Sequence, residues 1–159
     1  MSAENTEPKS QPQEPNEKTV ATQLPAPQAD WFLDLLVKMA HDGMEVGVTL
    51  LVEGFLVSGI LVSGPKYFEN IGAEFAAALS AQGQEGAESF KQTFAQIGDF
   101  SKPPADNSDA PPFAYIHLKD ARFFHNSGQP IPANHAVWWR GRLSEVAGFI
   151  IGNISYSAS

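Results

Sequence analysis

The chain has 159 residues, which is enough for one domain of ordinary size and hardly for two. Apolar residues make up 43% of it, so a real core is possible, while the formal net charge of −8 disfavours a nucleic-acid partner. The absence of cysteine excludes disulfides, thiolate catalysis and cysteine zinc sites. The N-terminus lacks the basic start and apolar run of a signal peptide, so we expect a cytoplasmic protein.

The first thirty residues are predicted to be a tail. Residues 1–30 contain no aromatic side chain and are rich in Pro, Glu, Gln and Asn. Such a segment buries too little apolar area to offset the entropy lost on folding. We therefore expect a disordered acidic tail, which either keeps the protein soluble or serves as a docking peptide, and a single domain over residues 31–159.

A short helix is predicted directly after this tail, in the sequence DWFLDLLVKMAHDG. Asp30 is a suitable N-cap, and Gly43 is a natural stop after the last turn. Trp31, Leu35 and Met39 fall on one apolar stripe. Because the helix is too short to be stable alone, it must dock on a larger element.

The longest apolar run, VGVTLLVEGFLVSGILVSG, is predicted to form a β-hairpin rather than to cross a membrane. A span needs about 20 uncharged apolar residues, whereas Glu53-Gly54 interrupts this run as a tight turn would. Gly59, in the second arm, marks a place where the sheet bends sharply or another backbone comes close. The residues that point to one side of the first arm are Val46, Val48, Leu50 and Val52.

A helical insertion follows the hairpin. The sequence KYFENIGAEFAAALSAQ has the apolar spacing of a helix, and AESFKQTFAQIGDF continues either as a second helix or after a kink. The next segment, SKPPADNSDAPP, is predicted to be a loop because prolines and aspartates exclude regular structure.

The last third of the chain is predicted to be β-structure. FAYIHLKDARFF alternates as a strand does, HNSGQPIPANH is a polar loop, and AVWWRGRLSEV and GFIIGNIS are two strands joined at Ala147-Gly148. In the first of these two strands, Val137, Trp139 and Leu143 are expected to point inward. The residues expected on the other side are Trp138, Arg140 and Arg142.

This order predicts an α+β domain. We expect a small, strongly bent five-stranded β-sheet or barrel of Sm or SH3-like type, with an N-terminal helix and a helical insertion after the second strand. The long hairpin with Gly59 inside it and the Arg140-Gly141 step favour this fold. The helical insertion departs from that type and leaves barrel closure open.

No motif of catalysis or metal binding is present. The sequence has no nucleophile elbow, phosphate-binding loop or dinucleotide fingerprint. Its histidines lack the spacing of metal ligands and are interpreted as polar loop residues. We therefore expect no enzyme, no cofactor and no metal site. The four histidines are His41, His117, His125 and His135.

Basic side chains gather in the C-terminal strands, whereas acidic ones crowd the tail, the insertion and the proline-rich loop. The basic residues are either ordinary solvated strand residues that form salt bridges with neighbouring acids, or a positive patch for an acidic protein surface, the tail or RNA. Trp138 is either exposed beside them, as in contact surfaces, or covered by the insertion. The candidate partner-binding residues are Trp138, Arg140, Arg142, Lys119 and Arg122.

Three segments in order resemble the family of the gas vesicle accessory protein GvpU: SGILVSGPKYFENI, YIHLKDARFF and VWWRGRLSEVAGFIIGNIS. The resemblance covers roughly residues 32–155. It implies a non-enzymatic cytoplasmic protein associated with gas vesicles, which acts in vesicle assembly or in vesicle–vesicle association.

The partners that the resemblance implies are vesicle shell proteins or other accessory proteins, and a free sheet edge would allow self-association. No membrane partner is expected. The alternative that the residues leave open is an Sm-like RNA-binding module, against which the net charge argues.

Overall fold

The chain folds into three helices and a six-stranded antiparallel sheet in the part that the computed structural model describes, residues 29–102, 113–125 and 129–154. The α+β prediction is confirmed. The predicted tail and the proline-rich loop fall almost entirely outside these ranges, so they stay predictions. The elements are α1 (Trp31–His41), β1 (Val46–Val52), β2 (Phe55–Val62), α2 (Gly64–Ala81), α3 (Ala87–Asp99), β3 (Tyr115–Phe124), β4 (Pro130–Ile131), β5 (Val137–Arg142), the 3₁₀ helix η1 (Leu143–Glu145) and β6 (Val146–Ile151).

Helix α1 begins and ends as predicted but buries a different stripe. The Asp30 side chain accepts hydrogen bonds from the first turn, and Gly43 follows the helix with a φ of 97°. Trp31 is 76% exposed, so the predicted stripe is wrong. The helix is apolar around most of its circumference, and its branched and small side chains, rather than Trp31, fit against the sheet. The buried residues are Leu33, Leu36, Val37 and Ala40.

The predicted β-hairpin is confirmed. Strands β1 and β2 pair in continuous register from Val46↔Leu61 to Val52↔Phe55. Glu53 and Gly54 connect them with φ values of 49° and 85°, as a tight hairpin turn requires. No helix within the described ranges is long and apolar enough to cross a membrane.

Gly59 shows both features predicted for it. The β2–β3 register shifts between Ser58 and Ile60, opposite Asp120, which has a φ of 53°. A Cβ atom at Gly59 would lie 2.9 Å from the Lys119 carbonyl oxygen and 3.1 Å from the Ala121 Cα atom. The strand therefore needs glycine at the point where the sheet bends and the neighbouring backbone crosses closely.

The sheet is strongly curled but open. Its path runs β4-β3-β2-β1-β6, and β5 also pairs with β3. In a flat sheet, β5 and β6 would lie four strand spacings apart, or about 19 Å. The four steps from Arg142 through η1 to Val146 span only about 8 Å at roughly 2 Å a residue, so the two edges must curl toward each other.

Of the two predicted alternatives, the open sheet is confirmed rather than the barrel, because no described pairing joins β5 to β6. Two details of the predicted sheet are wrong. The segment predicted as a polar loop contributes β4, which makes a sixth strand. The last two strands are joined at η1, and Ala147-Gly148 lies inside β6, because Leu143 turns into the core and ends β5. The strong bend itself is present.

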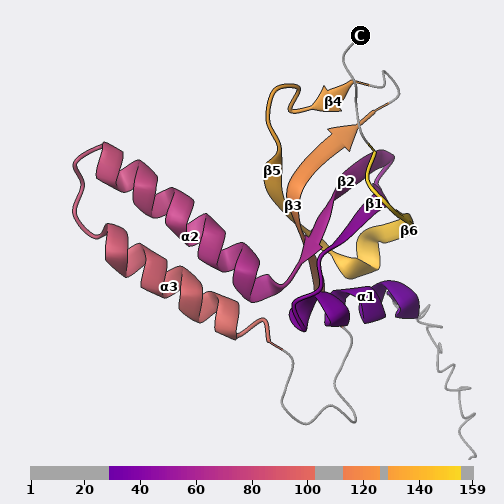
Figure 1. Ribbon diagram of the computed structural model, residues 1–159, viewed down its shortest axis with the longest axis horizontal. Helices are drawn as coiled ribbons and strands as arrows, with labels where there is room; N and C mark the ends of the chain where they lie inside the picture. Colours follow the sequence, from indigo (N-terminus) through magenta and orange to yellow (C-terminus); the bar gives the residue numbers. More distant parts are fainter. Residues whose placement is uncertain (1–28, 103–112, 126–128, 155–159) are drawn as a thin grey trace, which may run out of the picture.

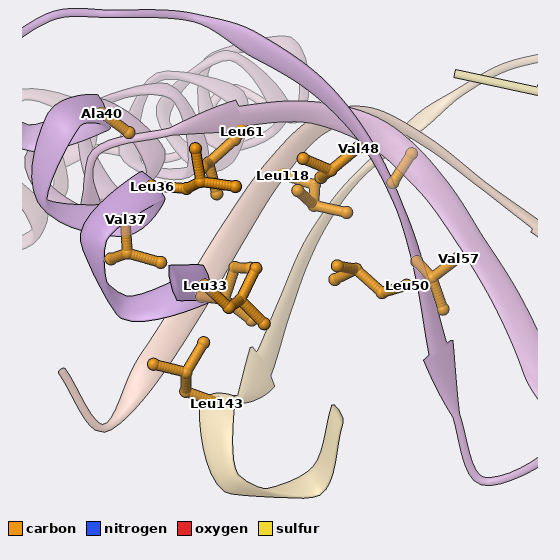
Figure 2. Packing of buried hydrophobic residues seen from close by; sticks show 12 residues of the cluster. Leu33, Leu36, Val37, Ala40, Val48, Leu50, Val57, Leu61, Leu118 and Leu143 are labelled. Carbon is orange, nitrogen blue, oxygen red and sulfur yellow. The ribbon is translucent and has the colours of Figure 1, made fainter. Parts of the chain in front are cut away.

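The core lies between α1 and the concave face of the sheet. Figure 2 shows Leu33, Leu36 and Val37 of α1 directed toward leucines and valines of the strands. Val48 and Leu50 are fully buried there, as the predicted alternation requires. The inward residues predicted in β5 are confirmed, since Val137 and Trp139 pack against this core and Leu143 lies within it.

The insertion forms a helical hairpin, so the two-helix alternative is confirmed. Helices α2 and α3 lie side by side and extend away from the sheet (Figure 1). They approach closely at glycines. A Cβ atom at Gly72 would lie 2.7 Å from the Phe94 Cβ atom, and one at Gly98 would lie 3.0 Å from the Pro65 Cα atom.

Candidate functional site

The five candidate residues all lie on the convex face of the sheet, opposite the core. The register pairs Tyr115 with Arg142 and His117 with Arg140, and strand alternation places Lys119 and Trp138 on the same side. The bulge at Asp120 adds one residue to β3, which returns Arg122 to this side opposite Ser58. We call this surface the outer face. Its candidate residues are Lys119, Arg122, Trp138, Arg140 and Arg142.

Arg140 is held by aromatic rings of the protein itself. Its guanidinium carbon lies 3.4 Å from the centre of the Tyr115 ring and 5.7 Å from that of Phe68. Its Nε–H donates a hydrogen bond to Nε2 of His117 at 3.3 Å. Cation–π contacts of this kind contribute roughly 0.5–2 kcal/mol. Arg140 therefore anchors α2 to the sheet, in addition to any contact with a partner.

Trp138 belongs to the same cluster. Its ring centre lies 6.2 Å from that of Tyr67, the residue before Phe68 on α2, and Tyr67 also packs 4.9 Å from His117. Trp138 is partly buried as a result. The helical insertion thus covers part of this tryptophan, and the remainder is available at the surface.

His117 is the buried centre of this cluster. Only 3% of its surface is exposed, and its pKa falls to about 3, chiefly because burial disfavours the charged ring and further because Arg140 is close. The neutral ring can accept the hydrogen bond from Arg140. Its Nδ1 atom has no hydrogen-bond partner within the described ranges.

The interpretation of His117 as a polar loop histidine is wrong. The sequence did place it in an alternating strand, but a contact with Arg140 depends on the pairing of β3 with β5 and on the position of α2. Neither can be read from local spacing. One signal in the sequence could have indicated that His117 is buried, namely its position between two apolar residues on a strand.

Acidic residues neutralise much of the basic charge of the outer face. Lys119 forms an ion pair with Glu45 at 2.5 Å, and Glu45 also binds Lys66. These two hydrogen bonds lower the pKa of Glu45 below its usual value. Arg142 lies 3.8 Å from Glu145, as the salt-bridge alternative predicts. Arg122 forms no ion pair in the part of the chain that the structure describes.

The segment after β6 crosses the outer face, which the sequence did not indicate. The Thr49 hydroxyl lies 2.9 Å from the Gly152 carbonyl oxygen and 2.9 Å from Ser58 Oγ, and the Ile154 N–H donates to Ser58 Oγ at 2.8 Å. Gly152 makes this turn possible with a φ of 118°. Because Ser58 pairs with Arg122, the C-terminal segment reaches the neighbourhood of the basic residues.

Most titratable side chains of the outer face are engaged in the His117 cluster or in ion pairs, and Arg122 is the exception among the candidate residues. Among the described residues, no three His, Asp or Glu side chains are close enough together to hold a metal ion.

The family model of the gas vesicle protein GvpU-like family matches residues 30–154. The chain belongs to this family. The matched region runs from the N-cap of α1 to the segment after β6, so it includes the whole sheet, the helical hairpin and the outer face. The resemblance noted in the sequence is confirmed, and the chain is related to gas vesicles.

Comparisons of this GvpU-like chain with curated proteins and with solved structures gave no match. The likeness to Sm or SH3 barrels therefore stays a prediction.

Proposed function

We propose that this GvpU-like protein acts in gas vesicle assembly or in vesicle–vesicle association through protein–protein contacts, without catalysing a reaction. Family membership supports a role with gas vesicle components. The observation that supports a contact with a partner protein is the outer face, where basic and aromatic side chains from β3 and β5 lie on one side of the sheet. Arginine and tryptophan are the residue types that dominate binding energy at protein interfaces.

Within this face, we assign the partner contact mainly to Arg122, Arg142 and the free part of Trp138. Arg122 has no described ion pair, and Arg142 is exposed with only a long contact to Glu145. Arg140 and Lys119 also contribute, but each is held by groups of the protein itself. The partner is an acidic surface of a vesicle shell protein or of another accessory protein.

An RNA partner is the weaker candidate. The chain carries a net charge of −8, and Lys119 and Arg142 already face carboxylates. RNA binding draws its affinity from uncompensated positive charge along the backbone of the nucleic acid. Protein recognition needs less net charge, because aromatic burial supplies much of the free energy.

Self-association through the free edge of β6 is a further part of the proposal. Strand β6 ends the sheet on that side, and its side chains Ile150 and Ile151 are 61% and 59% exposed. A strand edge with exposed apolar residues and no lysine or proline is open to pairing with another strand.

Flotation tests the proposal. The purified full-length chain is mixed with isolated gas vesicles, the vesicles are floated by low-speed centrifugation, and the protein in the floating layer is measured. We expect the protein in that layer, with less bound at high salt because charge contributes to the contact. Protein that stays in the subnatant at low salt rules the proposal out, and a shift of RNA mobility at the same salt favours the RNA-binding alternative.

A further inference from the structure

The helical hairpin carries an apolar stripe along one side. Ile71 and Phe75 are one turn apart on α2, and Phe90, Phe94 and Ile97 follow the same spacing on α3. The Phe75 and Phe94 rings stack at 5.5 Å, which joins the two rows into one surface. We call these five residues the hairpin stripe.

The hairpin stripe is open to solvent. Phe75 is 53%, Phe90 46% and Ile97 39% exposed, and the only buried residue of α3 is Gly98. The hairpin extends away from the sheet (Figure 1). Tyr67 and Phe68, near the start of α2, contact His117 of the sheet. No described segment of the chain covers the stripe.

The opposite side of the same hairpin is polar or small. It carries Glu69, Ala73 and Ser80 on α2, and Lys91 and Ala95 on α3. This one-sided distribution is what one half of a four-helix bundle has, because two such hairpins bury their apolar sides against each other. A single hairpin leaves this apolar side exposed to solvent.

Acidic side chains without a described ion pair lie at the far end of the hairpin, whereas its near end, which also carries the exposed Glu69, is attached beside arginines of the sheet. Glu85 and Glu88 lie at the far end, and neither forms an ion pair within the described ranges. The exposed Arg142 lies on the outer face to which the near end is attached, beside Arg140, which touches Phe68. An antiparallel partner laid along the stripe brings its acidic end to these arginines, whereas a parallel partner sets like charges together.

We propose that two copies of this chain associate through their hairpin stripes, antiparallel about a twofold axis, to form a four-helix bundle. A twofold arrangement uses the same surface on both copies, so one apolar stripe is sufficient. This interface is separate from the β6 edge. It does not depend on the proposed role with gas vesicles.

The first test measures the oligomeric state of the purified full-length chain by sedimentation equilibrium. We expect a dimer for the natural sequence. Phe75→Glu and Phe90→Glu place a charge on the stripe and should weaken the dimer at least about tenfold, as loss of an interface anchor does. Ser80→Glu adds the same charge on the polar side of the hairpin and should leave the dimer intact. Circular dichroism checks that all variants keep their helices.

A monomeric natural chain, or a dimer that survives both stripe variants, overturns the proposal. So does equal dissociation in Ser80→Glu. A dimer that is lost only when Ile150 and Ile151 on β6 are changed assigns the interface to the sheet edge instead.

The second test determines the orientation and does not rely on a disruptive variant. Because the chain has no cysteine, Gln84→Cys gives a single spin label at the far end of each hairpin. Antiparallel packing should separate the two labels by roughly the length of α2, about 27 Å for 18 residues, or more. A label distance of about one helix diameter, roughly 10 Å, overturns the antiparallel arrangement.

Discussion

At the scale of single residues, the pair formed by Arg140 and His117 determines how the insertion is attached. Arg140 donates a hydrogen bond to Nε2 of His117 and lies over the Tyr115 ring. The rings of Tyr67 and Phe68 on α2 pack against His117. The arrangement requires a neutral imidazole, because a protonated ring has no acceptor and would repel the guanidinium. The stability of the protein should therefore depend on pH through His117.

The sign of this dependence follows from the depressed pKa. Below pH 6.5 the unfolded chain takes up a proton at His117, whereas the folded chain does so only near pH 3. The unfolded state binds more protons in this window, so the stability from the neutral ring is complete above pH 6.5 and is lost as the pH falls toward 3. Between pH 7 and pH 5, the expected loss is about 2 kcal/mol.

His117→Gln tests this expectation, because glutamine keeps an acceptor for Arg140 but does not titrate. Urea unfolding at pH 7 and pH 5 gives the free energy for both chains. The other groups that titrate are present in both chains, so their contributions largely cancel in the difference. The natural chain should lose about 2 kcal/mol more than the variant on acidification, and parallel pH curves would show that His117 is not the titrating group.

At the scale of elements, two connections depend on contacts of single residues. The first is the contact between α2 and α3 at Gly72, where a Cβ atom would meet the Cβ atom of Phe94. That atom belongs to the start of a side chain and cannot swing away, so a larger residue must push the helices apart.

We expect Gly72→Leu to destabilise the protein by about 2 kcal/mol, although leucine favours a helix more than glycine does. Ala77→Leu is the matched control, because Ala77 is exposed on the same helix and should change the free energy of unfolding by less than about 0.5 kcal/mol. Chemical denaturation measures both. A stabilising effect of Gly72→Leu would contradict the close helix contact.

The second connection is the anchor of the C-terminal segment on Ser58 and Thr49. Ser58→Ala removes the acceptor of the Ile154 N–H and should free that segment. Hydrogen exchange at Ile154 should become about tenfold faster, which corresponds to the roughly 1.4 kcal/mol of a partly buried hydrogen bond. Ser144→Ala, at an exposed position in η1, serves as the control. Unchanged exchange at Ile154 would mean that the segment is held by other contacts.

At the scale of the whole molecule, the sequence predicted what local patterns determine. The turn at Glu53-Gly54 and the caps of α1 depend on residues close in the chain, and a glycine inside a strand indicates a bend before its neighbouring strand is known. All three predictions are confirmed. The stripe that α1 buries depends on the shape of the sheet below it. The position of His117 depends on two pairings between distant elements, and strand alternation alone cannot supply them.

The candidate site was predictable in one respect and not in another. Alternation along β5 placed Trp138, Arg140 and Arg142 on one side, and the structure has them there. The sequence could not predict the cation–π contacts of Arg140 with Tyr115 and Phe68, because Phe68 comes from an inserted helix. Because these contacts hold Arg140, we assign the proposed partner contact mainly to Arg122 and Arg142.

The most direct measurement of the central claim is quantitative flotation of a double variant. Arg122→Glu with Arg142→Glu reverses the charges of the two outer-face arginines that the aromatic cluster does not hold, and leaves the His117 cluster in place. Lys91→Glu with Lys102→Glu changes the net charge equally on α3 and just beyond it. The outer-face account predicts that the first variant leaves the floating vesicle layer while the second stays bound, and equal binding of both variants would contradict it.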